Sequence, residues 1–160
     1  MRSIPDSDLL FIWEQGLEKG VIHSGLQLIK AAFPDCTITD LERLPIGRRD
    51  GLLLQIHEQI MGPDLAGLAD CPNCGETMEL NLSIPDIQIK SEPEISASNS
   101  LSISESGYEI KTLGYVVGFR LPDSTDQEAI LHFKDPAKAR TEILRRCIWR
   151  ARFDEEDIEA

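Results

Sequence analysis

The sequence predicts an α+β protein, and three observations carry this prediction. Apolar residues recur at helical spacing through most of residues 1–62. Residues 77–84 instead alternate apolar and polar side chains, which is typical of a half-buried strand. Helix-capping residues return after residue 123, and no regular strand–helix alternation of a parallel sheet is present. We therefore expect an N-terminal helical unit, a small antiparallel sheet and two C-terminal helices.

The predicted helical unit covers residues 1–64 and begins with a helix over about residues 7–19. Asp6 or Ser7 is positioned to cap this helix, and Gly20 to end it. Its apolar residues form a stripe that we expect to face the core, namely Leu9, Leu10, Trp13 and Leu17.

Three more helices are predicted before residue 64. Thr37 and Asp40 have the spacing of an imperfect capping box, which would open the short middle helix. The longest helix carries leucines and isoleucines on one face and is followed by Gly62-Pro63, which ends it. The three segments are residues 23–32, a short helix from residue 37, and residues 48–61.

Residues 65–122 form the predicted β unit. Strands at 66–70 and 77–84 flank a CPNCG turn, and a second hairpin about Gly114 is predicted from residues 108–113 and 115–121. The serine-rich segment 91–106 is either a flexible excursion or a weak edge strand, because its SLSIS stretch alternates.

The C-terminal helices are predicted within residues 123–153. Ser124 and Gln127 have the spacing of a capping box for the first, and Asp135-Pro136 is a cap followed by proline for the second, which would run to about residue 153. Cys147 falls among apolar residues at helical spacing, so we expect it to be a small core residue. An acidic tail follows at 154–160, and we expect all the parts to pack as one compact domain.

The net charge of −12 argues against binding to nucleic acid or to an anionic membrane surface, because both require a positive face. No apolar run approaches the roughly 20 residues that a membrane-spanning helix needs. The N-terminus lacks the basic and apolar regions of a secretory signal, so we expect a cytoplasmic protein.

The sequence offers no convincing catalytic constellation. The histidines His23, His57 and His132 are scattered and match no metalloprotease or deaminase spacing. There is neither a phosphate-binding loop nor a dinucleotide fingerprint. We therefore expect a protein that is not an enzyme.

The CPNCG turn presents Cys71 and Cys74 as candidate metal ligands. Pro72 stiffens the turn, and Gly75 permits the positive φ that lets backbone amides point towards thiolates. A zinc site needs four ligands, so two more would have to come from Cys36, Cys147, a histidine or a second copy of the chain. The alternative is a metal-free turn in which two reduced thiols cap a hairpin.

Several short motifs, in this order, resemble the small baseplate-hub assembly chaperones and baseplate proteins of contractile-tail phages and extracellular contractile injection systems. The resemblance is collinear over roughly residues 8–150 and includes a single CPxCG knuckle. The motifs are LL (9–10) followed by WEQG (13–16), AAFP (31–34), LPIGRRDGLLL (44–54), the Gly-Pro turn (62–63), CPNCG (71–75), FRLPDSTD (119–126) and ILRRC (143–147).

The resemblance implies a non-enzymatic assembly factor or structural baseplate component that binds hub or spike proteins and can be incorporated into a tail-like particle. A candidate partner surface combines the loop 45–50 with the basic last helix, where Arg48, Arg49, Arg145 and Arg146 are the candidate binding residues. An alternative is a small zinc-knuckle adaptor or regulator in the cytoplasm, and a third class is an enzyme with a cryptic site.

Overall fold

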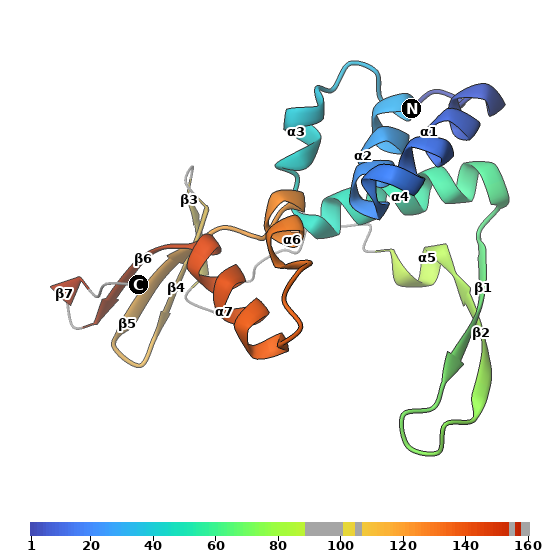
Figure 1. Ribbon diagram of the computed structural model, residues 1–160. Coiled ribbons are helices and arrows are strands. Elements are labelled where there is room, and N and C mark those ends of the chain that lie inside the picture. The colour runs from blue at the N-terminus through green and yellow to red at the C-terminus, as the bar shows by residue number, and fades with distance from the viewer. Residues whose placement is uncertain (89–100, 105–106, 154–155, 158–160) are drawn as a thin grey trace. The chain divides into compact units, whose positions relative to one another are not determined.

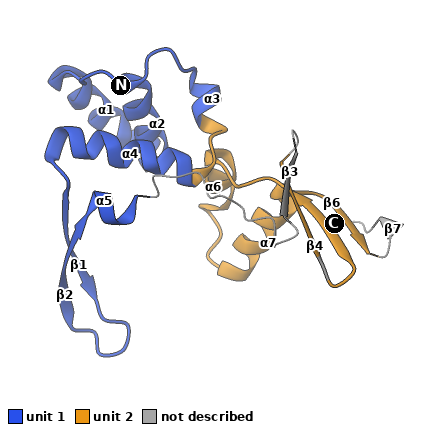
Figure 2. Ribbon diagram, turned by 180° about the vertical axis from the view of Figure 1, so that it is seen from behind, with its two compact units in different colours: residues 1–41, 47–90 blue, residues 42–46, 91–160 orange. Residues whose placement is uncertain are grey.

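A computed structural model describes residues 1–88, 101–104, 107–153 and 156–157 (Figure 1). Its helices and antiparallel strands confirm the predicted α+β class. The chain divides into two compact units, each with its own elements (Figure 2). Unit 1 comprises Met1–Leu41 and Gly47–Lys90, and unit 2 comprises Glu42–Ile46 and Ser91–Ala160.

The four N-terminal helices are present where the sequence predicts them: α1 (Asp6–Lys19), α2 (Val21–Ala32), α3 (Ile38–Glu42) and α4 (Ile46–Met61). The capping box of α3 is confirmed, since Thr37 Oγ1 accepts from Asp40 N at 3.1 Å and Asp40 Oδ2 accepts from Thr37 N at 3.2 Å. The predicted cap of α1 is wrong. Pro5 is the N-cap and no side chain caps the helix, because Asp6 already lies in its first turn.

The core of unit 1 lies between α1, α2 and α4, and its most buried side chains include Ile12, Leu26, Ile29 and Ile56. Gly16 allows close approach of α1 and α2, because a Cβ built there would lie 2.2 Å from Ser24 Oγ. The line of Ile12 and Gly16, four residues apart, therefore faces α2. The predicted α1 stripe is not the core face: Leu10, Trp13 and Leu17 are 57%, 62% and 71% exposed.

A hairpin arm follows α4 and projects from the helices of unit 1 (Figure 1). It consists of β1 (Asp64–Asp70) and β2 (Thr77–Ser83), paired antiparallel with Asp64 opposite Ser83 and Asp70 opposite Thr77. The short helix α5 (Ile84–Ile87) anchors its base, because Ile84 is fully buried and its N–H donates to Pro63 O at 2.8 Å.

Unit 2 contains a five-stranded antiparallel sheet in the order β3-β4-β5-β6-β7. The predicted hairpin about Gly114 is confirmed, and residues 101–104 adopt the edge-strand alternative; the rest of the serine-rich segment 91–106 lies outside the described residues. The strands are β3 (Leu101–Ser104), β4 (Gly107–Thr112), β5 (Tyr115–Phe119), β6 (Ile148–Phe153) and β7 (Glu156–Asp157).

Two helices of unit 2, α6 (Ser124–Ile130) and α7 (Pro136–Cys147), follow the β4–β5 hairpin. Asp135 caps α7 as predicted, accepting from Ala137 N at 2.9 Å. The last helix is shorter than predicted, because residues 148–153 leave it to pair with β5 as strand β6. Pairing with β6 satisfies the backbone N–H and C=O groups along the edge of β5. The β-branched and aromatic residues of IWRARF also favour a strand.

Candidate functional site

The CPNCG turn lies at the tip of the hairpin arm and closes as a tight knuckle. Cys71 N donates to Glu76 O at 2.9 Å, and Gly75 N donates to Cys71 O at 2.8 Å. Gly75 has φ +71°, the left-handed conformation that glycine adopts without strain. Asp70 and Thr77 hold the base of the turn, since Thr77 Oγ1 donates to Asp70 Oδ1 at 2.7 Å.

The knuckle stabilises a thiolate at Cys71. Backbone N–H groups of Cys74 and Asn73, and then the side chain of Cys74, form hydrogen bonds to the sulfur and lower the pKa of Cys71 below its usual value. Amides aimed at sulfur stabilise its charged form, which is the form that binds metals. Cys71 is partly accessible and Cys74 is exposed.

Within the described part of the chain, no cluster of three or more His, Cys, Asp or Glu side chains could hold a metal ion. All four cysteines and all three histidines of the sequence lie in that part. Within unit 1, Cys36 therefore does not complete a site with the knuckle. In a single chain, Cys71 and Cys74 supply two thiolate ligands where a structural zinc site needs four.

The four candidate arginines are distributed over both units. Arg48 is exposed near the start of α4, whereas Arg49 is 7% exposed and binds Asp50, with Nε and Nη2 at 2.9 and 2.7 Å from Asp50 Oδ1. Arg145 is largely exposed on α7 and pairs with Glu142 at 3.1 Å. Binding of a partner by these side chains stays a prediction.

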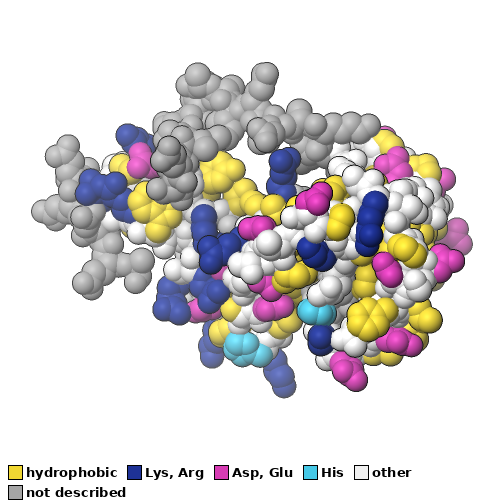
Figure 3. Space-filling view, turned by 90° about the horizontal axis from the view of Figure 1, so that it is seen from above, with side chains coloured by type: hydrophobic (Ala, Val, Ile, Leu, Met, Phe, Trp, Pro, Cys, Tyr) yellow, Lys and Arg dark blue, Asp and Glu magenta, His cyan; other side chains and the backbone are white. Residues whose placement is uncertain are grey.

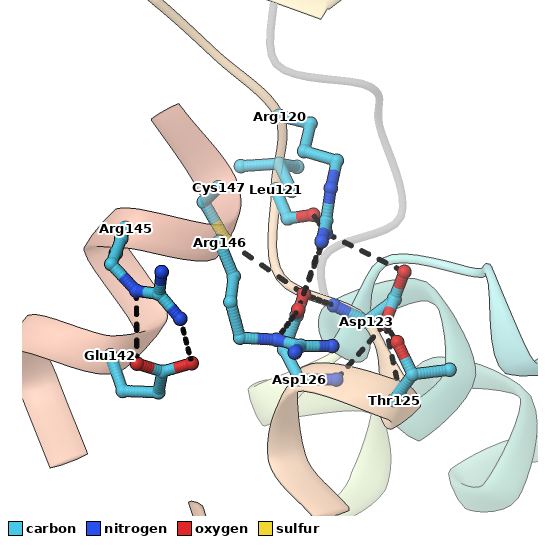
Figure 4. Close-up of polar contacts among 9 residues, drawn as sticks. All are labelled: Arg120, Leu121, Asp123, Thr125, Asp126, Glu142, Arg145, Arg146 and Cys147. Atoms are coloured by element: carbon cyan, nitrogen blue, oxygen red, sulfur yellow. Dashed lines mark hydrogen bonds and ion pairs between the residues drawn. The ribbon is translucent and has the colours of Figure 1, made fainter. Parts of the chain in front are cut away.

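Arg146, the fourth candidate, belongs to a buried ionic cluster centred on Asp126 (Figure 4). The Asp126 side chain is fully buried and accepts from Arg146 Nε at 2.8 Å. Arg120 binds the same carboxylate with two guanidinium nitrogens, Nη1 at 2.6 Å and Nη2 at 2.9 Å. The carboxylate thereby joins α6, α7 and the segment after β5.

The same carboxylate completes the cap of α6. Asp126 Oδ2 accepts from Asp123 N at 3.0 Å, while Asp123 Oδ1 accepts from Thr125 N and Asp126 N at 2.9 and 3.2 Å. Asp123 is therefore the N-cap, one residue before the predicted Ser124, and Asp126 takes the position predicted for Gln127. The sequence signal for this capping box is the D-x-x-D spacing of Asp123 and Asp126 within PDSTD.

Burial and ion pairing act in opposite directions on Asp126. Burial alone would raise its pKa, but the hydrogen bonds from Arg120, the Asp123 backbone and Arg146 outweigh it and hold the pKa well below the usual range. Burial and the neighbouring Asp126 charge raise the pKa of Cys147, whose Sγ lies 3.8 Å from Asp126 Oδ2. Cys147 is 6% exposed, which confirms its place in the core.

An apolar groove over α1 and α2 was not expected from the sequence, which placed Leu9, Trp13 and Leu17 on a stripe facing the core. We call it the α1 groove; it has a volume of about 310 Å³ and is lined by Leu9, Ile12, Trp13, Gly16, Leu17, Val21, Ser24 and Leu28. Val21 at its edge is 83% exposed. Figure 3, viewed from above, shows apolar side chains at the surface among charged ones.

Comparison with known proteins identifies the family of this chain. The family model described as T4 bacteriophage base plate protein matches residues 6–160. The chain belongs to this family. No curated protein and no solved structure matches it significantly.

The family match covers both units of this base plate protein, from the start of α1 to the C-terminus. It supports a structural component that is built into a phage tail and contacts other base plate components. None of the helices in the described residues is both long and apolar enough to span a membrane.

Proposed function

We propose that this chain is a non-enzymatic base plate component of a contractile tail that binds a hub or spike protein through the α1 groove. The observation that carries the proposal is the exposure of large apolar side chains on one helix pair, with Trp13, Leu17 and Val21 at 62%, 71% and 83%. Clustered exposed apolar residues mark protein interaction sites, and tryptophan is frequent among residues that dominate binding energy.

The groove has the form of a docking site for an apolar helix or loop. Its lining is almost entirely apolar, and two of its lining residues, Gly16 and Ser24, are small. A partner side chain inserted there would cover Trp13 and Leu17 without desolvating a charged group, which favours association. Trp13 also belongs to the first motif, within residues 9–16, by which the chain resembles hub assembly proteins.

The test is binding of the purified full chain to candidate hub and spike proteins of the same tail, measured by calorimetry. We expect Trp13→Glu/Leu17→Glu to weaken binding by about tenfold or more, because charged side chains would have to be buried in an apolar interface. Leu131→Glu is a matched control, since Leu131 is 67% exposed on unit 2 and does not line the groove. Equal binding by both variants would contradict the proposal.

The arginines of α7 provide a second, separable contact. Arg145→Glu alone is the charge reversal that tests this contact without disturbing the fold, because Arg145 pairs with Glu142 at the surface. Reversal of Arg146 would place a second carboxylate beside buried Asp126 and would report unfolding rather than binding. Binding that is unchanged by Arg145→Glu would leave the α1 groove as the contact.

Whether the protein acts as an assembly factor or remains in the base plate is distinguished by the composition of finished particles. We infer from the family match that the chain stays in the base plate, so purified tails should contain a fixed number of copies in each tail. Quantitative mass spectrometry of such tails measures this number directly. Tails that contain little of this chain would identify a transient assembly factor instead.

A further inference from the structure

The tip of the hairpin arm carries a Cys-x-x-Cys turn that is not part of the proposed docking groove. The turn presents the Cys71 and Cys74 thiols and is closed by hydrogen bonds from Cys71 N to Glu76 O at 2.9 Å and from Gly75 N to Cys71 O at 2.8 Å. A tight turn with this spacing places two thiolates where they can bind one metal ion. The knuckle alone contributes only half of a tetrahedral site.

The described residues of unit 1 supply no third ligand, because neither Cys36 nor His23 nor His57 forms a metal-binding group with the knuckle. Cys147 is buried in unit 2 against Asp126, which keeps it a thiol. A second copy of the knuckle would supply two more thiolates in the same arrangement.

The arm itself also lacks a covering surface. Its strands are exposed on both faces, and Leu68, Met78, Leu80 and Leu82 are 73%, 45%, 41% and 47% exposed. An isolated two-stranded hairpin is at best marginally stable in water, so an arm of this kind gains from packing against another surface.

The negative charge of the arm is the reason why two arms would need a cation between them. The arm residues 64–83 carry four acidic side chains, Asp64, Asp70, Glu76 and Glu79, and no lysine, arginine or histidine. Two arms brought together tip to tip would repel each other through these carboxylates. A divalent cation between the knuckles would offset part of that repulsion and draw the thiolates together.

We propose that the knuckles of two copies of this chain bind one Zn²⁺ between them, with Cys71 and Cys74 of each copy as the four ligands. Binding releases the thiol protons and links two hairpin arms tip to tip. The site is separate from the α1 groove, so either proposal can fail while the other stands.

The test uses the full chain purified without chelator under reducing conditions, with zinc measured by elemental analysis and mass measured by light scattering. We expect half a zinc per chain and a dimeric mass, and loss of both on chelation. Titration of the metal-free chain with Co²⁺ should saturate at one ion per two chains and develop thiolate-to-cobalt absorption. One metal per monomer, or a folded chain that takes up no metal, would overturn the proposal.

Matched serine variants assign the ligands. Cys74→Ser should lose zinc and become monomeric, whereas Cys36→Ser should keep both, because Cys36 lies near α3 and away from the knuckle turn. Circular dichroism checks that each variant is folded. If a variant does not fold, the Co²⁺ titration of the unmodified chain still tests the proposal. A dimer that survives Cys74→Ser, or zinc uptake only after a different protein is added, would refute sharing between two copies.

Discussion

Arg146 Nε donates to Asp126 Oδ1 at 2.8 Å, and this contact ties α7 to the first turn of α6 inside unit 2. Arg120, which directly follows β5, binds the same carboxylate through two guanidinium nitrogens. Its backbone N–H also donates to Cys147 O at 3.0 Å. One buried carboxylate therefore fixes the ends of three elements. Removing its charge would leave Arg146 beside a neutral side chain and Arg120 with the longer contact to Asp123 Oδ2 at 3.5 Å.

Asp126→Asn should destabilise unit 2 by about 2–3 kcal/mol, at the lower end for a broken buried pair because both guanidiniums keep water contact. Arg120 and Arg146 are 37% and 33% exposed at the side chain. Urea unfolding followed by circular dichroism measures the loss. Glu142→Gln removes the surface partner of Arg145 and should cost less than about 1 kcal/mol, so equal losses would contradict a special role for Asp126.

The contribution of Asp126 should depend on pH in the acid range. Its folded-state pKa lies well below the unfolded value of about 3.9, so its stabilisation is complete above that value and falls as the pH drops towards the folded pKa. The stability difference between the native chain and Asp126→Asn should therefore shrink from pH 6 to pH 3. A difference that stays constant over this range would show that the charge of Asp126 does not stabilise the fold.

The cysteines should differ sharply in reactivity. The lowered pKa of Cys71 enriches its thiolate, whereas burial and the Asp126 charge raise the pKa of Cys147. In metal-free native protein at neutral pH, iodoacetamide should label Cys71 much faster than Cys147, as followed by peptide mass spectrometry. Labelling in urea provides the control, because unfolding should abolish the difference. Comparable rates in the native chain would argue against the knuckle geometry.

Two apolar truncations distinguish the core of unit 1 from its exposed α1 groove. Ile29 is fully buried on α2, so Ile29→Ala should cost about 2–5 kcal/mol of unfolding free energy. Leu17 is 71% exposed, so Leu17→Ala should change stability by less than about 0.5 kcal/mol. Thermal and chemical unfolding measure both. A large loss for Leu17→Ala would mean that this residue is buried within the isolated chain.

Local sequence was enough for most of the elements. Helical spacing predicted α1, α2 and α4, the Thr37–Asp40 pair predicted the opening of α3, and strict alternation predicted β2. The CPNCG stretch predicted a tight turn between two strands, because its proline and glycine act on their own backbone. These signals are short-range energies between residues three or four apart, or two apart in a strand, so a sequence displays them directly.

Burial and polar clustering required the tertiary fold. Trp13 and Leu17 have helical spacing suited to a core, yet Gly16 sets the contact with Ser24 so that Ile12 faces α2 instead. Residues 148–153 could extend a helix, but the open edge of β5 draws them into a sheet. Asp126, Arg120 and Arg146 meet only after α6 and α7 fold back on β5. Such choices depend on which surfaces remain to be covered, and that is a property of the assembled chain rather than of any local stretch.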